Sequence, residues 1–414
     1  MAIHHSPFPM TTMRPIRETI PLDEALALVL DAGSPIERTE RVSIHDADGR
    51  VVAVSPVAAL DVPPFDRAAM DGYAVLAEDT FGAGRYEPRN LRCIEKVYTG
   101  AVPTRQLSRG ECAEIATGAP MPDGADAVVM VEETDRAGDG NVRIFTPVYP
   151  RQHVGRRGAD IESGQHVLAA GDVINASRIG ALAATGVLDV EVFAKPRVAI
   201  LSTGNEIVEP GRPLGPGQIY DINRYTLSAI ISAHGGIAVP LPTAQDDLAS
   251  LTAAIESAAS EDVVVFSGGS SVGERDLILD VLHATGEVLF HGIAVKPGKP
   301  TVFGRIGSRP FLGMPGYPTS CLSNAYMLLI PLLRRIARLP EHRPQIARMP
   351  LGRRIVSTTG RHQFYTVRIE NGAATPAFKA SGDITSMSRA DGYIEILAQT
   401  DIVEAGEMVD VKLF

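Results

Sequence analysis

The stretch KPRVAILSTGNE, residues 195–206, contains a short apolar run that ends in polar and glycine residues. The same arrangement returns in VVVFSGGSSVGE, residues 263–274. Segments with the 3.6-residue periodicity of helices lie between and after these runs. Short apolar runs that alternate with helices are typical of a parallel sheet with helices on both faces. We therefore predict a doubly wound α/β domain that begins at Lys195.

The predicted elements of this domain alternate along the chain. We expect strands over residues 198–202, 237–240 and 263–267, and helices over residues 223–234, 247–259 and 276–284. Ligands in such folds bind outside the carboxyl ends of the strands. Segments 202–206 and 267–274 fall at that edge, which makes them the first candidates for ligand contact. Residues 221–223 fit a helix cap as well as a ligand contact.

Other patterns flank this domain. A helix is predicted to begin at Leu22 and to end before Gly33, and helical patterning returns over residues 158–192. Residues 62–157 contain short β-type segments between Gly and Pro turns, which predicts a β-rich insertion in a discontinuous first domain. After residue 340, short alternating segments predict a small β-barrel or sandwich.

The bulk composition restricts the class of protein. At 414 residues the chain is too long for one compact core. A formal net charge of −10 opposes the phosphate backbone of nucleic acids. No apolar stretch reaches the ~18–20 residues of a membrane-spanning helix, and no signal peptide is readable. The three scattered cysteines favour a reducing compartment over a zinc site. We therefore expect a cytoplasmic protein that binds neither nucleic acid nor membrane.

A glycine–serine bend, residues 267–274, follows an apolar strand and precedes a predicted helix. Ser267, Gly268, Gly269 and Ser270 open it. Such residues let backbone N–H groups approach a phosphate. The spacing matches neither a Walker loop nor a dinucleotide fingerprint. The alternative is a tight strand-to-helix turn without a ligand.

A lysine turn, residues 296–300, reads Lys-Pro-Gly-Lys-Pro. Two prolines stiffen a loop that presents the ammonium groups of Lys296 and Lys299 beside a glycine. Such a pair suits a small oxyanion, and the alternative is a solvated basic turn. Pro315 and Pro318 lie in residues 314–320, which precede a helix predicted over residues 321–333. A helix N-terminus there would favour an anion, although Pro is also common at helix starts.

Scattered carboxylates offer oxygen ligands. Mg²⁺ prefers carboxylate, phosphate and water oxygens, so acids near an anionic ligand predict a magnesium site. Each acid by itself also fits a helix cap or a solvated side chain. A turn at residues 117–120 accompanies them. The acids are Asp71, Asp160, Glu206, Asp246 and Asp276.

Taken together, seven motifs in one order closely resemble the MoeA and gephyrin E-domain family of molybdopterin molybdenumtransferases. Their joint order is far more specific than any one motif. The motifs are residues 65–73, 117–120, 202–206, 220–223, 267–274, 296–300 and 314–320.

The resemblance implies four domains. They are a discontinuous elongated domain at residues 20–61 with 158–194, an inserted β-rich domain at 62–157, a MogA-like molybdopterin-binding α/β domain at 195–340 and a C-terminal β-barrel at 341–414. The resemblance also implies a homodimer with its site between subunits. The implied reaction is Mg²⁺-assisted insertion of molybdate into adenylyl-molybdopterin with release of AMP, and molybdopterin adenylyltransferase is the implied upstream donor.

The family's functional positions carry over to this chain by motif. The implied catalytic residues are Asp71, Thr117, Glu206 and Asp276. The implied metal ligands are Asp160, Glu206, Asp246 and Asp276. The implied substrate-binding residues are Ser267, Gly268, Gly269, Ser270, Lys296, Lys299, Pro315, Pro318 and Ser381.

Three positions depart from the family pattern. Asn205 stands where many relatives have Asp, Tyr317 where many have Asn, and Gly292 where some have Lys. These changes leave tungstate open as the oxyanion in place of molybdate. Two other hypotheses are a non-catalytic pterin-binding scaffold and a generic nucleotide-binding α/β protein, and the latter leaves the lysine turn without a role.

Overall fold

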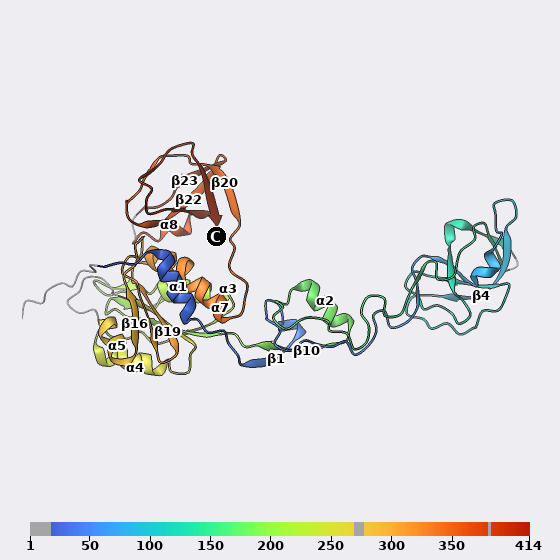
Figure 1. Cartoon of the computed structure of the whole chain (residues 1–414), viewed down its shortest axis with the longest axis horizontal. Helices are drawn as coiled ribbons and strands as arrows, with labels where there is room; N and C mark the ends of the chain where they lie inside the picture. Colours follow the sequence, from blue (N-terminus) through green and yellow to red (C-terminus); the bar gives the residue numbers. More distant parts are fainter. Residues whose placement is uncertain (1–17, 139, 269–276, 380–381) are drawn as a thin grey trace, which may run out of the picture. The chain divides into compact units, whose positions relative to one another are not determined.

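The computed structural model describes residues 18–138, 140–268, 277–379 and 382–414. The chain divides into two compact units (Figure 1). Unit 1 comprises Met1–Thr39 with Phe193–Phe414, and unit 2 comprises Glu40–Val192. No described helix is both long enough and apolar enough to span a membrane.

The main sheet of unit 1 has six strands in the order β14-β11-β15-β19-β18-β16. The first four run parallel, which confirms the predicted α/β alternation. Strand β18 pairs antiparallel with β19 and with β16, and a tight turn at Gly307, with φ of 62°, connects β18 to β19. The strands are β11 (Arg197–Ser202), β14 (Ile237–Pro240), β15 (Val263–Gly268), β16 (Glu287–His291), β18 (Val302–Ile306) and β19 (Arg309–Pro315).

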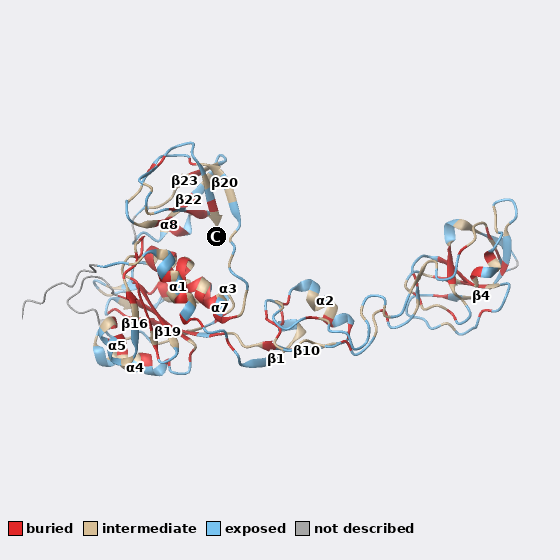
Figure 2. Ribbon diagram, viewed as in Figure 1, coloured by how far each residue is buried: buried red, intermediate tan, exposed pale blue. Residues whose placement is uncertain are grey.

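Helices cover both faces of this sheet, as Figure 2 shows by the buried strands between them. Successive side chains of β15 point to opposite faces, so Val265 joins one apolar core and Phe266 joins the other. This period of two explains why every residue of β15 is buried. Helices α4 (Leu248–Ser257) and α5 (Leu277–Thr285) cover one face, and α1 (Leu22–Ala32), α3 (Asn223–Ala233) and α7 (Ile330–Ile336) the other.

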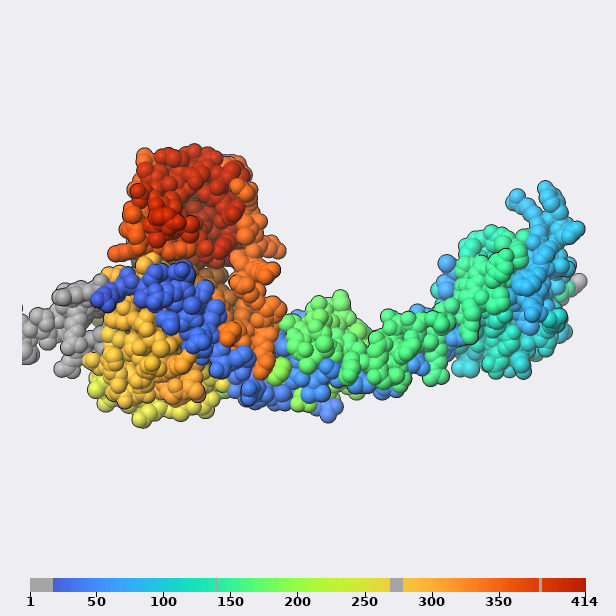
Figure 3. All heavy atoms as spheres, viewed as in Figure 1, coloured from blue at the N-terminus to red at the C-terminus, as the bar shows by residue number. Residues whose placement is uncertain are grey.

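Helix α1 packs within unit 1. Its buried side chains, Ala25, Val29 and Ala32, share a core with residues of α7. In the space-filling view α1 lies at the surface of this unit in blue, beside the orange residues (Figure 3). The sequence grouped this helix with residues 40–61, but its apolar face is buried against the α/β domain instead. The four-domain boundaries themselves stay a prediction.

The helix predicted over residues 321–333 is three consecutive pieces. Helix α6 (Pro318–Asn324) runs into a π-helical turn, η4 (Ala325–Leu329), and then into α7. Pro331 lacks the N–H group that would bond the carbonyl four residues earlier, and its ring crowds the preceding turn. A widened turn before this proline is the expected response.

The C-terminal part of unit 1 is a second sheet, in the order β17-β22-β24-β26-β20, with β23 paired to β22. Strand β17 (Val295–Lys296), at the start of the lysine turn, pairs parallel with β22. The predicted β character of this region is confirmed. The remaining elements are β20 (Ile346–Pro350), β21 (Ile355–Val356), β22 (His362–Glu370), β23 (Ala373–Pro376), α8 (Thr385–Ser388), β24 (Gly392–Ile396), β25 (Ile402–Val403) and β26 (Met408–Leu413).

Unit 2 contains a six-stranded sheet in the order β6-β3-β5-β4-β8-β7, which confirms the predicted β-rich insertion. Its strands are β3 (Gly72–Val75), β4 (Arg89–Val97), β5 (Glu111–Ile115), β6 (Ala127–Met130), β7 (Thr134–Gly138) and β8 (Asn141–Ile144). A separate core around Leu182 joins α2 (Ala176–Ala184) and the pair of β1 (Thr39–Ser43) and β10 (Asp189–Phe193).

Candidate functional site

The parallel strands of unit 1 end side by side at one edge of the sheet, which we call the carboxyl edge. Ser202 of β11 pairs with Ser267 of β15. On the other side, Gly268 of β15 pairs with Pro315 of β19. Pro318 follows as the first residue of α6. Four predicted substrate-binding residues therefore lie together at this edge.

The strand ends lie close together around Gly268. A Cβ atom added to Gly268 would lie 2.3 Å from Oγ1 of Thr203. One added to Gly316 would lie 3.2 Å from the carbonyl oxygen of Gly268. A side chain at Gly268 would therefore force the neighbouring strand end away, so glycine is required here for close packing.

A buried amide joins two of these strand ends. Nδ2 of Asn223, the first residue of α3, donates to Oγ of Ser267 at 2.7 Å and to the carbonyl oxygen of Gly316 at 2.8 Å. The sequence left residues 221–223 open between a cap and a ligand contact. Oδ1 of Asp221, one residue before the N-cap Ile222, accepts the N–H of Arg224 in the first turn of α3 at 3.0 Å, whereas the side chain of Asn223 crosses to the sheet.

Some polar atoms at the carboxyl edge are buried without a hydrogen-bond partner among the described residues. They include Oγ of Ser202 and Oδ1 of Asn223. Buried polar atoms in folded proteins almost always have a partner, which can be a ligand or an ordered water. The edge therefore offers polar groups that a bound molecule can satisfy.

The lysine turn lies at the same edge. Val302, the first residue of β18, pairs with Gly313 near the end of β19, so the lysine turn leads into the strand two places from β15. Nζ of Lys296 donates to Oγ1 of Thr358 at 2.8 Å. The carbonyl oxygen of Lys299 accepts the backbone N–H groups of Ile293, which follows β16, and of Thr301, which precedes β18. The lysine turn and the start of the glycine–serine bend are thus separated by β19 alone.

Two predicted acids also follow the carboxyl edge. The exposed Glu206 comes after β11, and its carboxylate folds back over Gly204, within 2.8 Å of where a Cβ atom would stand. The exposed Asp246 follows Ala244, whose N–H bonds to the carbonyl oxygen of Ser202. The neighbouring Asp247 is instead the N-cap of α4. Both predicted metal ligands are therefore open to solvent near the strand ends.

In unit 2, Asp71 and Thr117 contact each other directly. Oδ1 of Asp71 accepts the backbone N–H of Thr117 at 2.7 Å and its hydroxyl at 2.9 Å. These two hydrogen bonds, the backbone one first, hold the pKa of Asp71 below its ordinary value. The sequence predicted both residues as catalytic without predicting that they pair. Asp160, a predicted metal ligand, is exposed in the same unit.

Asp71 lines a cavity of about 480 Å³ in unit 2. Lys96 and Arg136 share its wall, and both pair with Oε2 of Glu114, at 3.0 and 2.6 Å. The two cations are only partly neutralised by this one carboxylate. The cavity therefore presents both signs of charge beside Asp71.

Four predicted site residues, Gly269, Ser270, Asp276 and Ser381, lie outside the described residues. Within the described ranges, no group of three or more His, Cys, Asp or Glu side chains is arranged to hold a metal ion. Glu206 and Asp246 belong to unit 1 and Asp160 to unit 2. The predicted magnesium ligands therefore stay a prediction.

The structure shows the surroundings of the three residues that depart from the family pattern. Gly292 has φ of 101°, a conformation that strains a residue with a side chain, so lysine could not replace it without a change of backbone. Tyr317, 63% exposed, is the N-cap residue of α6, and its ring lies 3.7 Å from the position of a Cβ on Gly382. Asn205 is exposed after β11.

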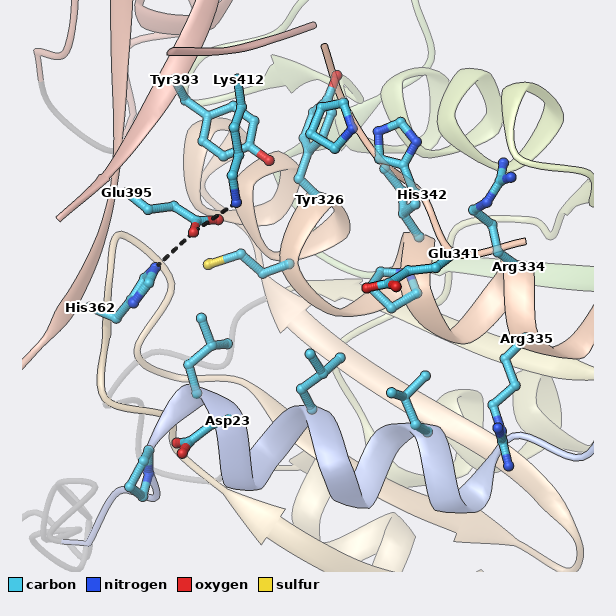
Figure 4. A pocket seen from close by; sticks show the side chains of 18 of the residues that line it. Asp23, Tyr326, Arg334, Arg335, Glu341, His342, His362, Tyr393, Glu395 and Lys412 are labelled. Atoms are coloured by element: carbon cyan, nitrogen blue, oxygen red, sulfur yellow. Dashed lines mark ion pairs between the residues drawn. The ribbon is translucent and has the colours of Figure 1, made fainter. Parts of the chain in front are cut away.

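A larger cavity of unit 1, about 1210 Å³, lies between α1, α7 and the C-terminal strands (Figure 4). Nζ of Lys412 lies 2.8 Å from Oε2 of Glu395, and Nε2 of His362 lies 3.9 Å from the same oxygen. Burial lowers the pKa of His362, against the raising effect of Glu395. None of the predicted site residues lines this cavity, so we place the candidate site at the carboxyl edge.

The sequence missed two residues that organise the site, Asn324 and Thr358, which each bond to the lysine turn. Asn223 lies in a segment that the sequence did single out, but its bond to Ser267 was not predicted. Of the two missed residues, Asn324 could have been recognised from the sequence. An amide in the middle of an otherwise apolar helical segment needs a hydrogen-bond partner when it is buried. Thr358 lies more than 60 residues from its partner and carries no local signal.

Comparison with known proteins covers nearly the whole chain. Residues 20–186 match the MoeA N-terminal region (domain I and II), residues 199–335 a probable molybdopterin binding domain, and residues 348–414 the MoeA C-terminal region (domain IV). The three matches follow one another in the order of the predicted domains.

Individual relatives agree with these matches. A Haemophilus influenzae protein named molybdopterin molybdenumtransferase is 32% identical over 402 residues, which cover 95% of this chain and 98% of that protein. Molybdopterin molybdenumtransferase 2 of Mycobacterium tuberculosis is 34% identical, over 89% of this chain and 94% of its own length. The crystal structure of a molybdopterin biosynthesis MoeA protein from Pyrococcus horikosii is 43% identical, with a TM-score of 0.82, over 96% of this chain and 99% of that one. With identity above 30% over almost its full length, this chain belongs to the MoeA family of molybdopterin molybdenumtransferases, enzymes of molybdenum-cofactor biosynthesis.

Proposed function

We propose that this enzyme inserts molybdate into adenylyl-molybdopterin and releases AMP. The observation that carries the proposal is the meeting of the lysine turn with Ser267 and Gly268 at one sheet edge. The substrates are both anionic, whereas the chain as a whole is acidic. Local ammonium groups are therefore needed to offset the repulsion between them.

The proposed reaction balances as follows. One water cleaves the phosphoanhydride bond of the adenylyl group, and AMP leaves. Two dithiolene sulfurs bind the metal as two oxide ligands leave as water, with two protons from the thiols and two from the hydrolysis. For ionised phosphates, one water is released overall and no net proton is consumed. Lys296 and Lys299 would hold the oxyanion, while Ser267 and Gly268 would contact the pterin nucleotide.

We further propose that Mg²⁺ assists this reaction. Carboxylate oxygens are the ligands that Mg²⁺ prefers, and the exposed Glu206 and Asp246 fit that donor set at the carboxyl edge. Bound there, the ion would supply positive charge against the phosphates. The hydrogen bonds from Thr117 stabilise the ionised carboxylate of Asp71 and lower its pKa, which suits a role beside a cation.

A homodimer is the proposed working form. The predicted acids belong to two units of the chain, and the resemblance implies that the site lies between subunits. We propose that one subunit contributes Asp71, Thr117 and Asp160 to the carboxyl edge of its partner. Molybdopterin adenylyltransferase is the proposed source of the adenylated substrate. Neither nucleic acid nor a membrane is a proposed partner.

The main experiment measures turnover of the purified enzyme. With adenylyl-molybdopterin, molybdate and Mg²⁺, we expect one AMP for each metallated pterin, and we expect a chelator to stop the reaction until Mg²⁺ is restored. Tungstate in place of molybdate tests the choice of oxyanion. Pterin binding without any AMP would reject the transferase reaction and support the scaffold hypothesis.

Mixed dimers test the shared site. One subunit carries Asp71→Ala and the other Glu206→Ala. If each site takes Asp71 from one subunit and Glu206 from the other, every mixed dimer retains one intact site and half of the wild-type activity. If both residues serve a site within one chain, the mixed dimers are as inactive as either variant alone.

A further inference from the structure

The side chain of Asn223 has a fixed orientation at the carboxyl edge. The carbonyl oxygen of Gly316 can only accept a hydrogen bond, so the amide group at 2.8 Å must turn its nitrogen toward it. The second N–H of Asn223 points to Oγ of Ser267 at 2.7 Å. Oδ1 of Asn223 therefore faces away from both contacts, and it is buried without a partner among the described residues.

The hydroxyl of Ser267 is oriented by the same contact. A hydroxyl oxygen has two acceptor positions and one hydrogen to donate. Here the oxygen accepts from Nδ2 of Asn223 at 2.7 Å, so its own hydrogen is directed away from Asn223. The thiol of Cys321, whose Sγ lies 3.8 Å away, is the other described group in reach, and a thiol is only a weak hydrogen-bond partner. Ser267 is 3% exposed, and its hydrogen has no strong acceptor among the described residues.

Asn223 and Ser267 lie side by side and together present one acceptor, Oδ1 of Asn223, and one donor, the hydroxyl of Ser267. A ligand that satisfies both must itself carry a donor next to an acceptor. A phosphate group at neutral pH carries mainly acceptors, and Oδ1 of Asn223, itself an acceptor, would repel it. The amide edge of a pterin ring carries an N–H beside a C=O, which matches the pair.

We propose that Asn223 and Ser267 form the subsite for the pterin ring, with Asn223 accepting from the ring N–H and positioning the Ser267 hydroxyl to donate to the ring carbonyl. This inference rests on the proposed function and deepens it, because it separates a ring subsite from the lysine turn that serves the anions. Asn223 thus has two roles, contact with the ring and orientation of Ser267.

The experiment compares two probes that carry different parts of the substrate. Neopterin carries the ring without phosphate, and AMP carries phosphate without the pterin. Fluorescence titration of neopterin and calorimetric titration of AMP are made with the full-length wild type, Asn223→Ala, Ser267→Ala and the double variant. We expect each single variant to weaken neopterin binding about tenfold, a loss typical of one or two buried hydrogen bonds, with AMP binding changed less than twofold.

The double variant tests whether the two residues act together. Because Asn223 orients Ser267, the double variant should bind neopterin much more tightly than the product of the two single effects predicts. Asn175→Ala serves as the matched control. Asn175 caps α2 in unit 2 through its side chain, so its loss should lower the melting temperature and leave both affinities unchanged.

Several outcomes would overturn the subsite. Equal losses for neopterin and AMP would indicate general loosening of the edge, and a loss confined to AMP would place phosphate there instead. Full additivity, or no neopterin binding by the wild type, would also contradict it. Failure of the proposed function looks different, since a wild type that binds neopterin in the expected pattern but releases no AMP in turnover leaves the ring subsite intact.

Discussion

The side-chain amide of Asn324 donates a hydrogen bond to the carbonyl oxygen of Gly298, at 3.1 Å, from the last position of α6. Asn324 is fully buried, and the same nitrogen also bonds to Oγ1 of Thr301. The hydroxyl of Thr301 in turn donates to the carbonyl oxygen of Gly298 at 2.7 Å. Three hydrogen bonds among Asn324, Thr301 and Gly298 therefore hold the lysine turn. They fix the backbone from which the side chains of Lys296 and Lys299 extend.

Replacing Gly298 by alanine should disrupt this turn. Gly298 has φ of 107°, and an added Cβ would lie 2.2 Å from Oδ1 of Asn324. Backbone strain and a clash with a buried side chain together predict a loss of about 3 kcal/mol in the free energy of unfolding. Denaturant titration measures this loss, and the KM for molybdate should rise with it.

Gly307→Ala is the matched control for that variant. Gly307 also has a positive φ, of 62°, but an added Cβ would meet nothing within 4 Å. It should lose only about 1 kcal/mol and keep the wild-type KM. Equal losses for the two variants would show that the contact with Asn324 does not matter.

Thr117→Val should alter the titration of Asp71. The substitution removes the hydroxyl that donates to Asp71 at 2.9 Å but keeps the backbone N–H. The pKa of Asp71 should therefore rise part of the way toward its ordinary value. Since the folded-state pKa is depressed, any stability linked to it is present above the unfolded pKa and is lost as the pH falls. Carboxyl carbon NMR of Asp71 measures the change.

Turnover gives a second measure of this pair. Asp71→Asn should lower kcat at neutral pH while leaving the melting temperature close to that of the wild type, because the residue is exposed at the surface of unit 2. Asp79, half-buried in the same unit, likewise accepts a backbone N–H, that of Gly110, so Asp79→Asn is a control that should keep full activity. An unchanged kcat in Asp71→Asn would remove Asp71 from the mechanism.

His234 should make stability depend on pH in the acid range. Burial, with the nearby His342 and Arg334, lowers the pKa of His234 to about 4, and burial also lowers that of His342. The unfolded chain therefore binds more protons than the folded one below pH ~6.5, the ordinary value for histidine. Stability should fall as the pH drops from about 6.5 to 4, and level off below that for this group.

The expected size of this pH effect depends on how far His234 is exposed. His234 is only half-buried, so solvent screening reduces the expected effect to about 1 kcal/mol. His234→Phe preserves the edge-on ring contact with His342, 4.9 Å between centroids in the wild type, and should flatten this part of the profile. His283→Gln, at an exposed position of α5, should keep the wild-type slope. Identical slopes for wild type and His234→Phe would contradict the assignment.

Cys93 should be the most reactive thiol of the chain. It pairs with Cys112 across the parallel strands β4 and β5, and a hydrogen bond from the Cys112 thiol lowers the pKa of Cys93 to about 6. Burial raises the pKa of Cys321 to about 12. At pH 7, iodoacetamide should therefore modify Cys93 first, since the thiolate is the nucleophile.

Cys112→Ala tests the cause of that reactivity. Without the neighbouring thiol the pKa of Cys93 should rise toward its ordinary value, and alkylation at pH 7 should slow several-fold. Cys321→Ala leaves the β4–β5 pair intact and should not change the rate. Mass spectrometry after timed labelling distinguishes the two results, and faster labelling of Cys321 than of Cys93 would refute the order.

Local patterns in the sequence were sufficient for much of the fold. Apolar runs such as Val263–Phe266 identify strands, because a strand buried on both faces needs apolar residues at every position. The 3.6-residue stripe that begins at Leu22 identifies α1 for a similar reason. The antiparallel strands β16 and β18 were not predicted. Pairing direction depends on which strands meet, and residues 287–306 carry no local mark of that choice.

The ordered motifs identified the family and placed the candidate residues at strand ends and turns. They could do so because glycines, prolines and apolar runs determine the main-chain conformation locally. Only the tertiary structure decided which polar atoms meet. Asn223 reaches Ser267 and Asn324 reaches Gly298 across separations of 44 and 26 residues. Hydrogen bonds act over about 3 Å, so such partners are determined by the packing of helices on the sheet rather than by any spacing along the chain.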